Sequence, residues 1–348
     1  MAYEVLYRKY RPKTFSEVVG QDHITSVLKG EAESGNFSHA YLFSGSRGTG
    51  KTSVARIFAR ALGCTEKDLY EIDAASNTGV DDVRELRDGV RTLPFDSPVK
   101  VYLIDEVHML SKSAFNALLK TLEGPPAHVV FILATTELNK VLDTIISRCE
   151  TFVFRRPTIQ ILIETIKKVA KKEGLKIEAE AVRLIAFLGD GSFRDCLGLL
   201  QKIISGAHGE EVTLALVEEI TGLPQLSLIQ DFLLALLNAD TNTALGLLNT
   251  IAKDNRDIKV FCKRLLDELR FSMLIKYGPE LRKEIEDSTD PERIKFFDKI
   301  ASHPNSTKIS AVLKELLECH DLIGTTHILQ LPLELATISI TEKIKNTK

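Results

Sequence analysis

A glycine-rich stretch near the start of the chain matches the phosphate-loop pattern G-x-x-x-x-G-K-[ST]. The apolar run before it, residues 40–44, predicts a buried strand, and residues 53–62 after it carry apolar side chains at helical spacing. A strand, a loop and a helix that opens at the end of the loop form the context that this motif requires. We therefore expect an α/β P-loop domain with a nucleotide site. The loop consists of Gly45, Ser46, Arg47, Gly48, Thr49, Gly50, Lys51 and Thr52.

The residue types of this loop suit a nucleoside triphosphate bound with magnesium. Glycine has no Cβ, so successive backbone N–H groups can converge on phosphate oxygens, and the following helix offers its unpaired N–H groups to the same anion. We expect Lys51 to reach the β- and γ-phosphates and the Thr52 hydroxyl to ligate Mg²⁺. A glycine turn that merely caps a helix would explain the loop but not its flanks.

A second informative stretch, residues 100–106, is an apolar strand that ends in Asp105 and Glu106. On their own, paired acids at the end of a strand indicate an ordinary turn. Downstream of a phosphate loop they predict that Asp105 holds Mg²⁺ through water and that Glu106 orients or deprotonates the attacking water. The expected ligands are therefore a nucleoside triphosphate and Mg²⁺, and the family resemblance described below implies that the nucleotide is ATP.

Three further predicted strands complete the sheet: an alternating stretch at residues 68–73, an apolar run at 129–134 and a last strand at 151–154. Thr135 and Thr136 follow the second of these strands. This polar pair either contacts the γ-phosphate or the attacking water, or simply ends a β-branched strand. Five such strands separated by helices predict a parallel sheet.

Beyond the basic segment at residues 155–157 the apolar spacing predicts helices to the end of the chain. Arg194 opens one of these helices, either as a solvated residue or as part of the site. We expect a nucleotide-binding domain in residues 1–157, a small helical lid in 158–222 and an all-α domain for packing or assembly in 223–348.

The composition of the chain limits its partners and its compartment. The formal net charge is −3, so contact with nucleic acid must come from local patches or from partner subunits. The five cysteines are scattered without a C-x-x-C pair. No signal peptide and no apolar run of membrane length is visible in the sequence. We therefore expect a reduced, cytoplasmic protein with no membrane partner.

Seven short motifs follow one another along the chain: Leu6–Pro12, Val18–Gln21, His39–Phe43, Asp73–Asn77, Asp105–Leu110, Ser147–Cys149 and Gly191–Asp195. Together they resemble clamp-loader ATPases of the AAA+ class, and within that class the bacterial DNA polymerase III gamma/tau family. The resemblance is dense to about residue 205. Beyond that it rests on length and helical character.

The resemblance implies roles for residues whose own context left alternatives open. Arg148 would be an arginine finger that acts in trans on the γ-phosphate of a neighbouring subunit. Thr136 would be the sensor at the end of its strand, with Thr135 as second choice, and Arg194 would be the sensor of the lid domain. The adenine pocket would be lined by Tyr10, Arg11, Pro12 and Val19.

The same resemblance implies partners. Loader subunits of this kind form a hetero-pentameric arc with ATP at the subunit interfaces, open a ring-shaped sliding clamp and place it on primed DNA. DNA would be held mainly through its phosphates, so binding would depend on salt and not on sequence. We expect DNA contacts from the helix that begins near Asn77–Gly79 and from the helix between Ser111 and Lys120.

Two features depart from the family pattern. Relatives commonly insert a four-cysteine zinc knuckle before the second strand, whereas here Cys64 is followed directly by residues 65–69, so we expect no zinc site. The sequence also ends at Lys348, without the long tail that binds helicase and polymerase in longer forms. We therefore expect either a short, gamma-like form or a longer protein cut to this length.

Two other functions compete with an ATP-hydrolysing loader subunit. A non-hydrolysing scaffold subunit of the same arc would keep Ser147–Cys149 but lose the phosphate loop. A branch-migration or helicase motor of the AAA+ class would share the loop and the lid arginine, and would usually end in a winged-helix domain with strands.

Overall fold

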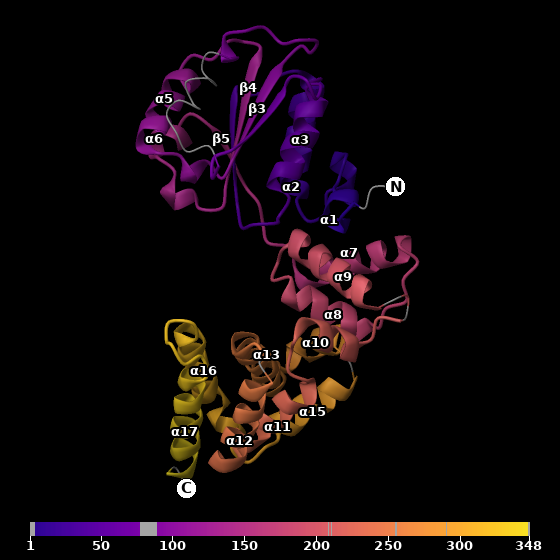
Figure 1. The fold of residues 1–348 in the computed structure, drawn as a ribbon, viewed down its shortest axis with the longest axis vertical. Helices are drawn as coiled ribbons and strands as arrows, with labels where there is room; N and C mark the ends of the chain where they lie inside the picture. The colour runs from indigo at the N-terminus through magenta and orange to yellow at the C-terminus, as the bar shows by residue number, and fades with distance from the viewer. Residues whose placement is uncertain are drawn as a thin grey trace. The chain divides into compact units, whose positions relative to one another are not determined.

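The computed structural model describes residues 4–76, 89–207, 209, 211–254, 256–289 and 291–346. The contacts divide the chain into two compact units, Met1–Glu211 and Val212–Lys348, and each is described here by itself (Figure 1). The predicted DNA-contacting segment near Asn77–Gly79 lies outside the described residues. The limits of the three expected domains remain a prediction.

The first unit is built on the expected parallel sheet. Its strands are β1 (Ala40–Ser44), β2 (Leu69–Asp73), β3 (Lys100–Asp105), β4 (Val129–Thr135) and β5 (Glu150–Val153). Their order is β2-β3-β4-β1-β5, and every neighbouring pair is parallel. Both β1 and β4 are buried along their whole length, because helices cover the two faces of the sheet. The α/β fold class is therefore confirmed.

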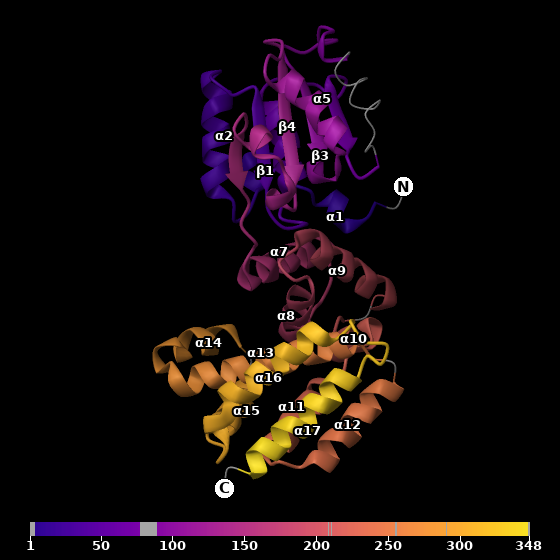
Figure 2. The ribbon, with the colours of Figure 1, turned by 90° about the vertical axis from the view of Figure 1, so that its left-hand side faces the viewer.

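The helices of this part are α1 (Leu6–Lys9), α2 (Asp22–Ser34), α3 (Lys51–Ala61), α5 (Lys112–Leu122) and α6 (Asp143–Ile146), with short 3₁₀ turns η1 (Phe15–Glu17), η2 (Val107–Met109) and η3 (Leu138–Lys140). Figure 1 shows α2 and α3 on one face of the sheet and α5 and α6 on the other, and Figure 2 shows α5 in front of the strands. Side chains of a strand alternate between the two faces. Accordingly Ala40 and Leu42 join the core under α5 and α6, while Tyr41 and Phe43 join the core under α2 and α3.

Three helices follow the sheet: α7 (Ile159–Lys172), α8 (Ala179–Leu188) and α9 (Phe193–Ala207). The Thr158 side chain accepts a hydrogen bond from the Ile161 N–H and caps the start of α7. The apolar faces of the three helices pack on one another, and α1 packs against α9. A small helical domain thus follows the sheet, and the N-terminal segment lies beside it.

The sheet topology determines where a ligand can bind. Strand β1 pairs with β4 so that Ser44 lies opposite Thr135, and β2 pairs with β3 so that Asp73 lies opposite Asp105. The carboxyl ends of parallel strands therefore share one edge of the sheet. Ligands of open α/β sheets bind in the crevice outside this edge.

The second unit consists of helices, with no strand among its described residues. Its helices are α10 (Leu214–Thr221), α11 (Leu226–Leu237), α12 (Thr241–Lys253), α13 (Ile258–Tyr277), α14 (Arg282–Ser288), α15 (Pro291–Ala301), α16 (Ile309–Leu322) and α17 (Leu331–Lys345), with 3₁₀ turns η4 (Pro279–Leu281) and η5 (Ser306–Lys308). Helix α13 is central, since it packs against α11, α14, α15 and α16. The expected all-α C-terminal part is confirmed.

Buried charges in this unit are paired. The guanidinium of Arg264 donates to Glu218 Oε1 over 3.2 Å and to the Pro224 carbonyl over 2.8 Å, which ties the joint between α10 and α11 to α13. Arg293 donates to Glu268, whose pKa burial raises. Such pairing is required because an unpaired charge in a core is strongly destabilising.

Among the described residues no single helix is both long and apolar enough to cross a membrane. One bent pair, Leu214–Thr221 with Leu226–Leu237, meets the length and composition criteria jointly, at an angle of 82°.

Candidate nucleotide site

The phosphate loop lies between β1 and α3, as predicted. Lys51, the first residue of α3, is buried, and its Nζ donates to the carbonyls of Gly45 at 2.7 Å and Ser46 at 3.0 Å. Burial lowers the pKa of Lys51, and the charges of Glu106 and Asp105 oppose that shift. The ammonium group is therefore held on the loop, close to where phosphates would bind. The Ser46 hydroxyl is buried and has no hydrogen-bond partner in the described part of the chain.

All three glycines of the loop, Gly45, Gly48 and Gly50, adopt positive φ angles that other residues rarely tolerate. Gly50, at φ +104°, caps the start of α3. Gly48, at φ +74°, faces the lid so closely that a Cβ would lie 1.9 Å from Ser192 Oγ. The Gly48 carbonyl also accepts a hydrogen bond from the Phe193 N–H at 3.1 Å. The loop therefore needs glycine at position 48 for contact with the lid.

The predicted magnesium ligands lie together. Thr52 Oγ1 donates to Asp105 Oδ2 over 2.8 Å, which joins the end of the loop to the end of β3. A hydroxyl beside a carboxylate is a donor set that suits Mg²⁺, which is usually held by one or two protein oxygens, substrate phosphates and water. These residues therefore fit the metal.

Glu106 follows β3 in a left-handed conformation at φ +49°. Its Oε2 accepts hydrogen bonds from the Thr136 hydroxyl at 2.8 Å and from the Thr136 N–H at 3.2 Å. The other candidate sensor, Thr135, is fully buried, and its hydroxyl lies 3.0 Å from His108 Nδ1. The structure thus places Thr136, the first choice from the sequence, against the expected catalytic carboxylate.

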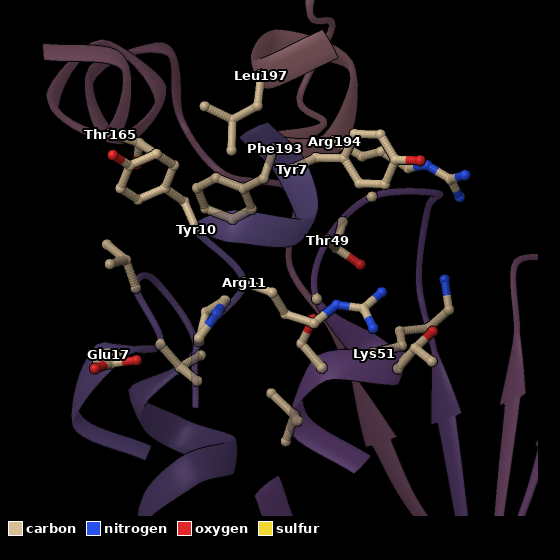
Figure 3. A pocket seen from close by; sticks show the side chains of 18 of the residues that line it. Tyr7, Tyr10, Arg11, Glu17, Thr49, Lys51, Thr165, Phe193, Arg194 and Leu197 are labelled. Carbon is tan, nitrogen blue, oxygen red and sulfur yellow. The ribbon is translucent and has the colours of Figure 1, made fainter. Parts of the chain in front are cut away.

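A pocket of 540 Å³ opens between the loop, the N-terminal segment and the lid (Figure 3). This volume lies in the usual range for small-molecule sites. Arg47 to Thr52 line it, with Asp105 and Glu106. Four residues expected at the adenine also line it: Tyr10, Arg11, Pro12 and Val19. Gly45 and Ser46 are not among the lining residues, and meet the site through Lys51.

Positive charges surround this pocket. Burial lowers the pKa of Arg11, and the charge of nearby Arg56 lowers it further. Arg194, at the start of α9, lines the pocket, and its guanidinium carbon lies 5.1 Å from the ring centroid of Tyr7. Figure 3 shows the side chain of Arg11 directed toward the phosphate loop at Lys51. A polyanion such as a triphosphate would complement these charges.

Lid and N-terminal residues that the sequence did not single out as site residues complete the wall: Tyr7, Thr165, Lys168, Val169, Lys172, Phe193 and Leu197. Contacts between the end of α1 and the end of α7 bring these lid and N-terminal residues together. Lys9 Nζ donates to Glu173 over 2.6 Å, and the Tyr10 hydroxyl donates to the same carboxylate. Phe193 lies beside Arg194 in the motif Gly191–Asp195, so the motif could have indicated Phe193 as a site residue.

Arg148 does not line this pocket. It follows α6, where its guanidinium donates to the Thr144 carbonyl at 2.7 Å and to Glu123 Oε1 at 2.8 Å. Glu123 ends α5, the helix that begins shortly after Glu106 and η2. The candidate finger is partly exposed, and it is connected to the Glu106 segment through α5.

Cys64, where relatives carry a zinc knuckle, is buried, and its Sγ donates to the Thr65 carbonyl at 3.4 Å. Burial raises the pKa of this thiol to about 11. Within the described ranges no group of three or more His, Cys, Asp and Glu side chains could hold a metal ion. The expected absence of a zinc site remains a prediction.

Two family models match the chain. A model for "DNA polymerase III, delta subunit" matches residues 20–78 and 65–158, and a model for "DNA polymerase III clamp loader subunit, ATPase lid domain" matches residues 162–209. In fold, the chain is similar to the Thermotoga maritima RuvB Holliday junction branch migration motor. The TM-score is 0.53 over 66% of this chain and 79% of that one, at 20% identity. That similarity shows the fold alone.

Curated relatives match most of the chain. It is 42% identical to DNA polymerase III subunit tau of Bacillus subtilis over 82% of this chain and 54% of that protein. It is 38% identical to DNA polymerase III subunit tau of Escherichia coli over 80% of this chain and 46% of that protein. The chain thus spans about half the length of these relatives. DNA polymerase III subunit gamma of Buchnera aphidicola is 38% identical over 81% of this chain and 82% of its own length. This match over most of both proteins shows that the chain belongs to the gamma/tau family of DNA polymerase III clamp-loader subunits.

Proposed function

We propose that the chain is an ATP-hydrolysing motor subunit of a bacterial DNA polymerase III clamp loader. The observation that carries this proposal is the convergence of Lys51, Thr52, Asp105 and Glu106 on one cationic pocket. A scaffold subunit that does not hydrolyse ATP would not need these four side chains together. The family is consistent with the proposal, while hydrolysis itself is inferred from the side chains.

The reaction is attack of water on the γ-phosphorus of ATP. The water oxygen bonds to phosphorus, the bond from phosphorus to the β,γ-bridging oxygen breaks, and ADP leaves with that electron pair. Glu106 orients the water and accepts its proton, while Lys51 and Arg194 stabilise charge on the phosphate oxygens. Thr52 and Asp105 would hold magnesium, which would supply positive charge against the negative charge of the phosphates.

Arg148 acts on a neighbouring subunit in this proposal. It is absent from the lining of its own pocket and partly exposed, as a residue that serves an interface would be. Arginine fingers supplied in trans raise phosphoryl-transfer rates by about 10³–10⁵. The chain alone should therefore hydrolyse ATP slowly, and assembly should accelerate it.

We further propose that the second unit assembles the arc through an apolar face on α16 and α17. Seven large apolar side chains are exposed on these helices and the segment between them: Leu317, Leu322, Ile328, Leu329, Leu331, Leu335 and Ile338. Exposed apolar patches of this kind mark contact surfaces, and the proposed occupant is the corresponding face of another loader subunit. Leu335→Asp should therefore reduce assembly measured by light scattering. Unchanged assembly would contradict this placement.

The proposed substrates of the assembled loader are a sliding clamp and primed DNA. Exposed Lys120 on α5 is a candidate phosphate contact. Removing one phosphate contact should weaken DNA binding uniformly across sequences and lower the salt slope by about 1. A Lys120→Ala loader whose affinity and salt slope equal those of the wild type would exclude this contact.

The test is ATP turnover by the full chain, alone and with its partner loader subunits, clamp and primed DNA. Lys51→Ala, Glu106→Gln and Arg148→Ala should each abolish most of the stimulated turnover. Arg183→Ala, which removes a lid arginine paired with Glu180, is the matched control and should leave turnover unchanged. If partner subunits, clamp and DNA stimulate Arg148→Ala as strongly as wild type, the proposed action of Arg148 in trans is refuted.

The same assay separates the alternatives. No turnover in any mixture, with nucleotide binding intact, would indicate a non-hydrolysing scaffold. Turnover stimulated by branched DNA without clamp or loader subunits would indicate a branch-migration motor, whose relatives share the fold. The helical second unit does not favour that motor, because a winged-helix end would contribute strands.

A further inference from the structure

His108 lies in η2, two residues beyond Glu106, and has no assigned role. Its side chain is only 6% exposed although it belongs to a turn at the edge of the sheet. Nδ1 lies 3.0 Å from the Thr135 hydroxyl and 3.4 Å from Glu106 Oε2, and Nε2 lies 3.4 Å from Glu137 Oε1. A buried imidazole thus lies between the expected catalytic carboxylate and the segment after β4.

The contacts to Glu106 all converge on one of its two oxygens. Oε2 receives both Thr136 hydrogen bonds and faces His108 Nδ1. No hydrogen bond or ion pair to Oε1 is found among the described residues, and Glu106 lines the pocket. One carboxylate oxygen is therefore anchored, while the other remains for a water molecule.

The far side of the imidazole is also fixed. Glu137 donates its backbone N–H to Thr135 Oγ1 at 3.0 Å, and its carboxylate pairs with Lys140 at 2.8 Å. This hydrogen bond from Lys140 holds the pKa of Glu137 below its ordinary value. His108 therefore connects Glu106 to an ordered, charged segment.

We propose that His108 is a positioning residue for Glu106. Together with Thr136 it fixes Oε2 and orients the carboxylate so that Oε1 faces the water that attacks the γ-phosphate. The contacts of 3.4 Å are long, as catalytic contacts often are before substrate binds, and they shorten when the site closes. The inference rests on the proposed ATPase function. The ordinary alternative is that the imidazole only fills the core and bonds Thr135.

Two substitutions separate the two sides of the ring. His108→Asn retains an amide near the Nδ1 position, on the side of Glu106 and Thr135, and loses the contact with Glu137. His108→Gln places its amide near the Nε2 position and loses the contact with Glu106. We expect kcat in the stimulated loader to fall about tenfold in His108→Gln and to stay within about threefold of wild type in His108→Asn. The ATP dissociation constant should change less than about twofold in both, because Glu106 acts on the water.

The same substitutions in a Glu106→Gln background test whether His108 acts through Glu106. If it does, His108→Gln will lower the residual rate by less than about twofold there, since effects of residues that act as a unit are not additive. A full tenfold further loss, or a loss of ATP affinity equal to the loss of kcat, would show a general structural role and overturn the inference. Wild-type kcat in His108→Gln would also overturn it.

Failure of the proposed function gives a different result. If Glu106→Gln itself leaves turnover unchanged, both the proposed function and this inference are wrong. If Glu106→Gln is slow and His108→Gln is normal, only the inference is wrong. Thermal unfolding of each variant shows whether lost turnover reflects lost folding. If His108→Gln unfolds early, His108→Ala, which also loses the contact with Glu106, takes its place in the comparison.

Discussion

Replacing Gly48 by alanine should weaken nucleotide binding by forcing the lid away from the phosphate loop. An alanine at φ +74° costs about 1–2 kcal/mol. Its Cβ would also lie 1.9 Å from Ser192 Oγ and 2.8 Å from Ser192 Cβ. Rotating the hydroxyl away does not resolve the overlap, because the Cβ remains and Oγ loses its bond from the Asp195 N–H. Overpacking of this kind costs about 1–3 kcal/mol.

The overlap with Ser192 should lower the affinity for nucleotide, because residues of the lid line the nucleotide pocket. If the lid must close against the new Cβ, the dissociation constant of a fluorescent ATP analogue should rise about 5- to 150-fold in Gly48→Ala. Ser192→Gly removes both overlapping atoms and leaves Cα at 3.3 Å, so the double variant should recover most of the loss. Gly35→Ala is the control for backbone strain, since Gly35 has φ +69° and no neighbour within 4 Å. Wild-type affinity in Gly48→Ala, or no recovery in the double variant, would refute the reasoning.

Two further variants test other contacts. Asp68 is buried, and although burial raises its pKa, hydrogen bonds from residues 95–97 hold it at about 2, below the ordinary 3.8. A carboxylate whose pKa is lower in the folded than in the unfolded protein stabilises the fold at a pH above its unfolded pKa, and this stabilisation is lost as the pH falls through its folded pKa. Asp68→Asn should therefore lower urea resistance by a constant amount from about pH 5 to 8, and the difference from wild type should shrink below about pH 4. Glu123→Gln should raise stimulated ATPase by at most about fivefold, because an exposed pair with Arg148 is worth about 0–1 kcal/mol; a fall would mean that Glu123 aids the finger.

The central part of the site could be predicted from the sequence because its signals are local. Lys51 and Thr52 follow one apolar strand, and Asp105 and Glu106 end another. Parallel strands bring such ends to one edge, so position along the chain was enough to place these residues near one another. The sheet and its covering helices followed from the same apolar runs.

The rest of the site depends on tertiary approach. Tyr10 is near Glu173 only because α1 packs beside the lid, and no periodicity in either segment indicates this contact. Arg148 was identified through resemblance alone, and the contact with Glu123 joins residues from separate elements. His108 was visible in a motif, but its position between two carboxylates required the path of the chain after β4.

Helix α5 has a consequence for cooperation between subunits. It starts shortly after Glu106, the carboxylate proposed to act at a subunit's own nucleotide. It is followed directly by Glu123, whose carboxylate holds the arginine proposed to act on the next subunit. Its 11 residues form a rod about 16 Å long. A small tilt at the nucleotide end would be carried to Glu123 and would alter how firmly Arg148 is held. In the proposed arc, the nucleotide state of one subunit would thus affect the arginine that serves its neighbour, and the subunits would hydrolyse ATP in sequence and not independently.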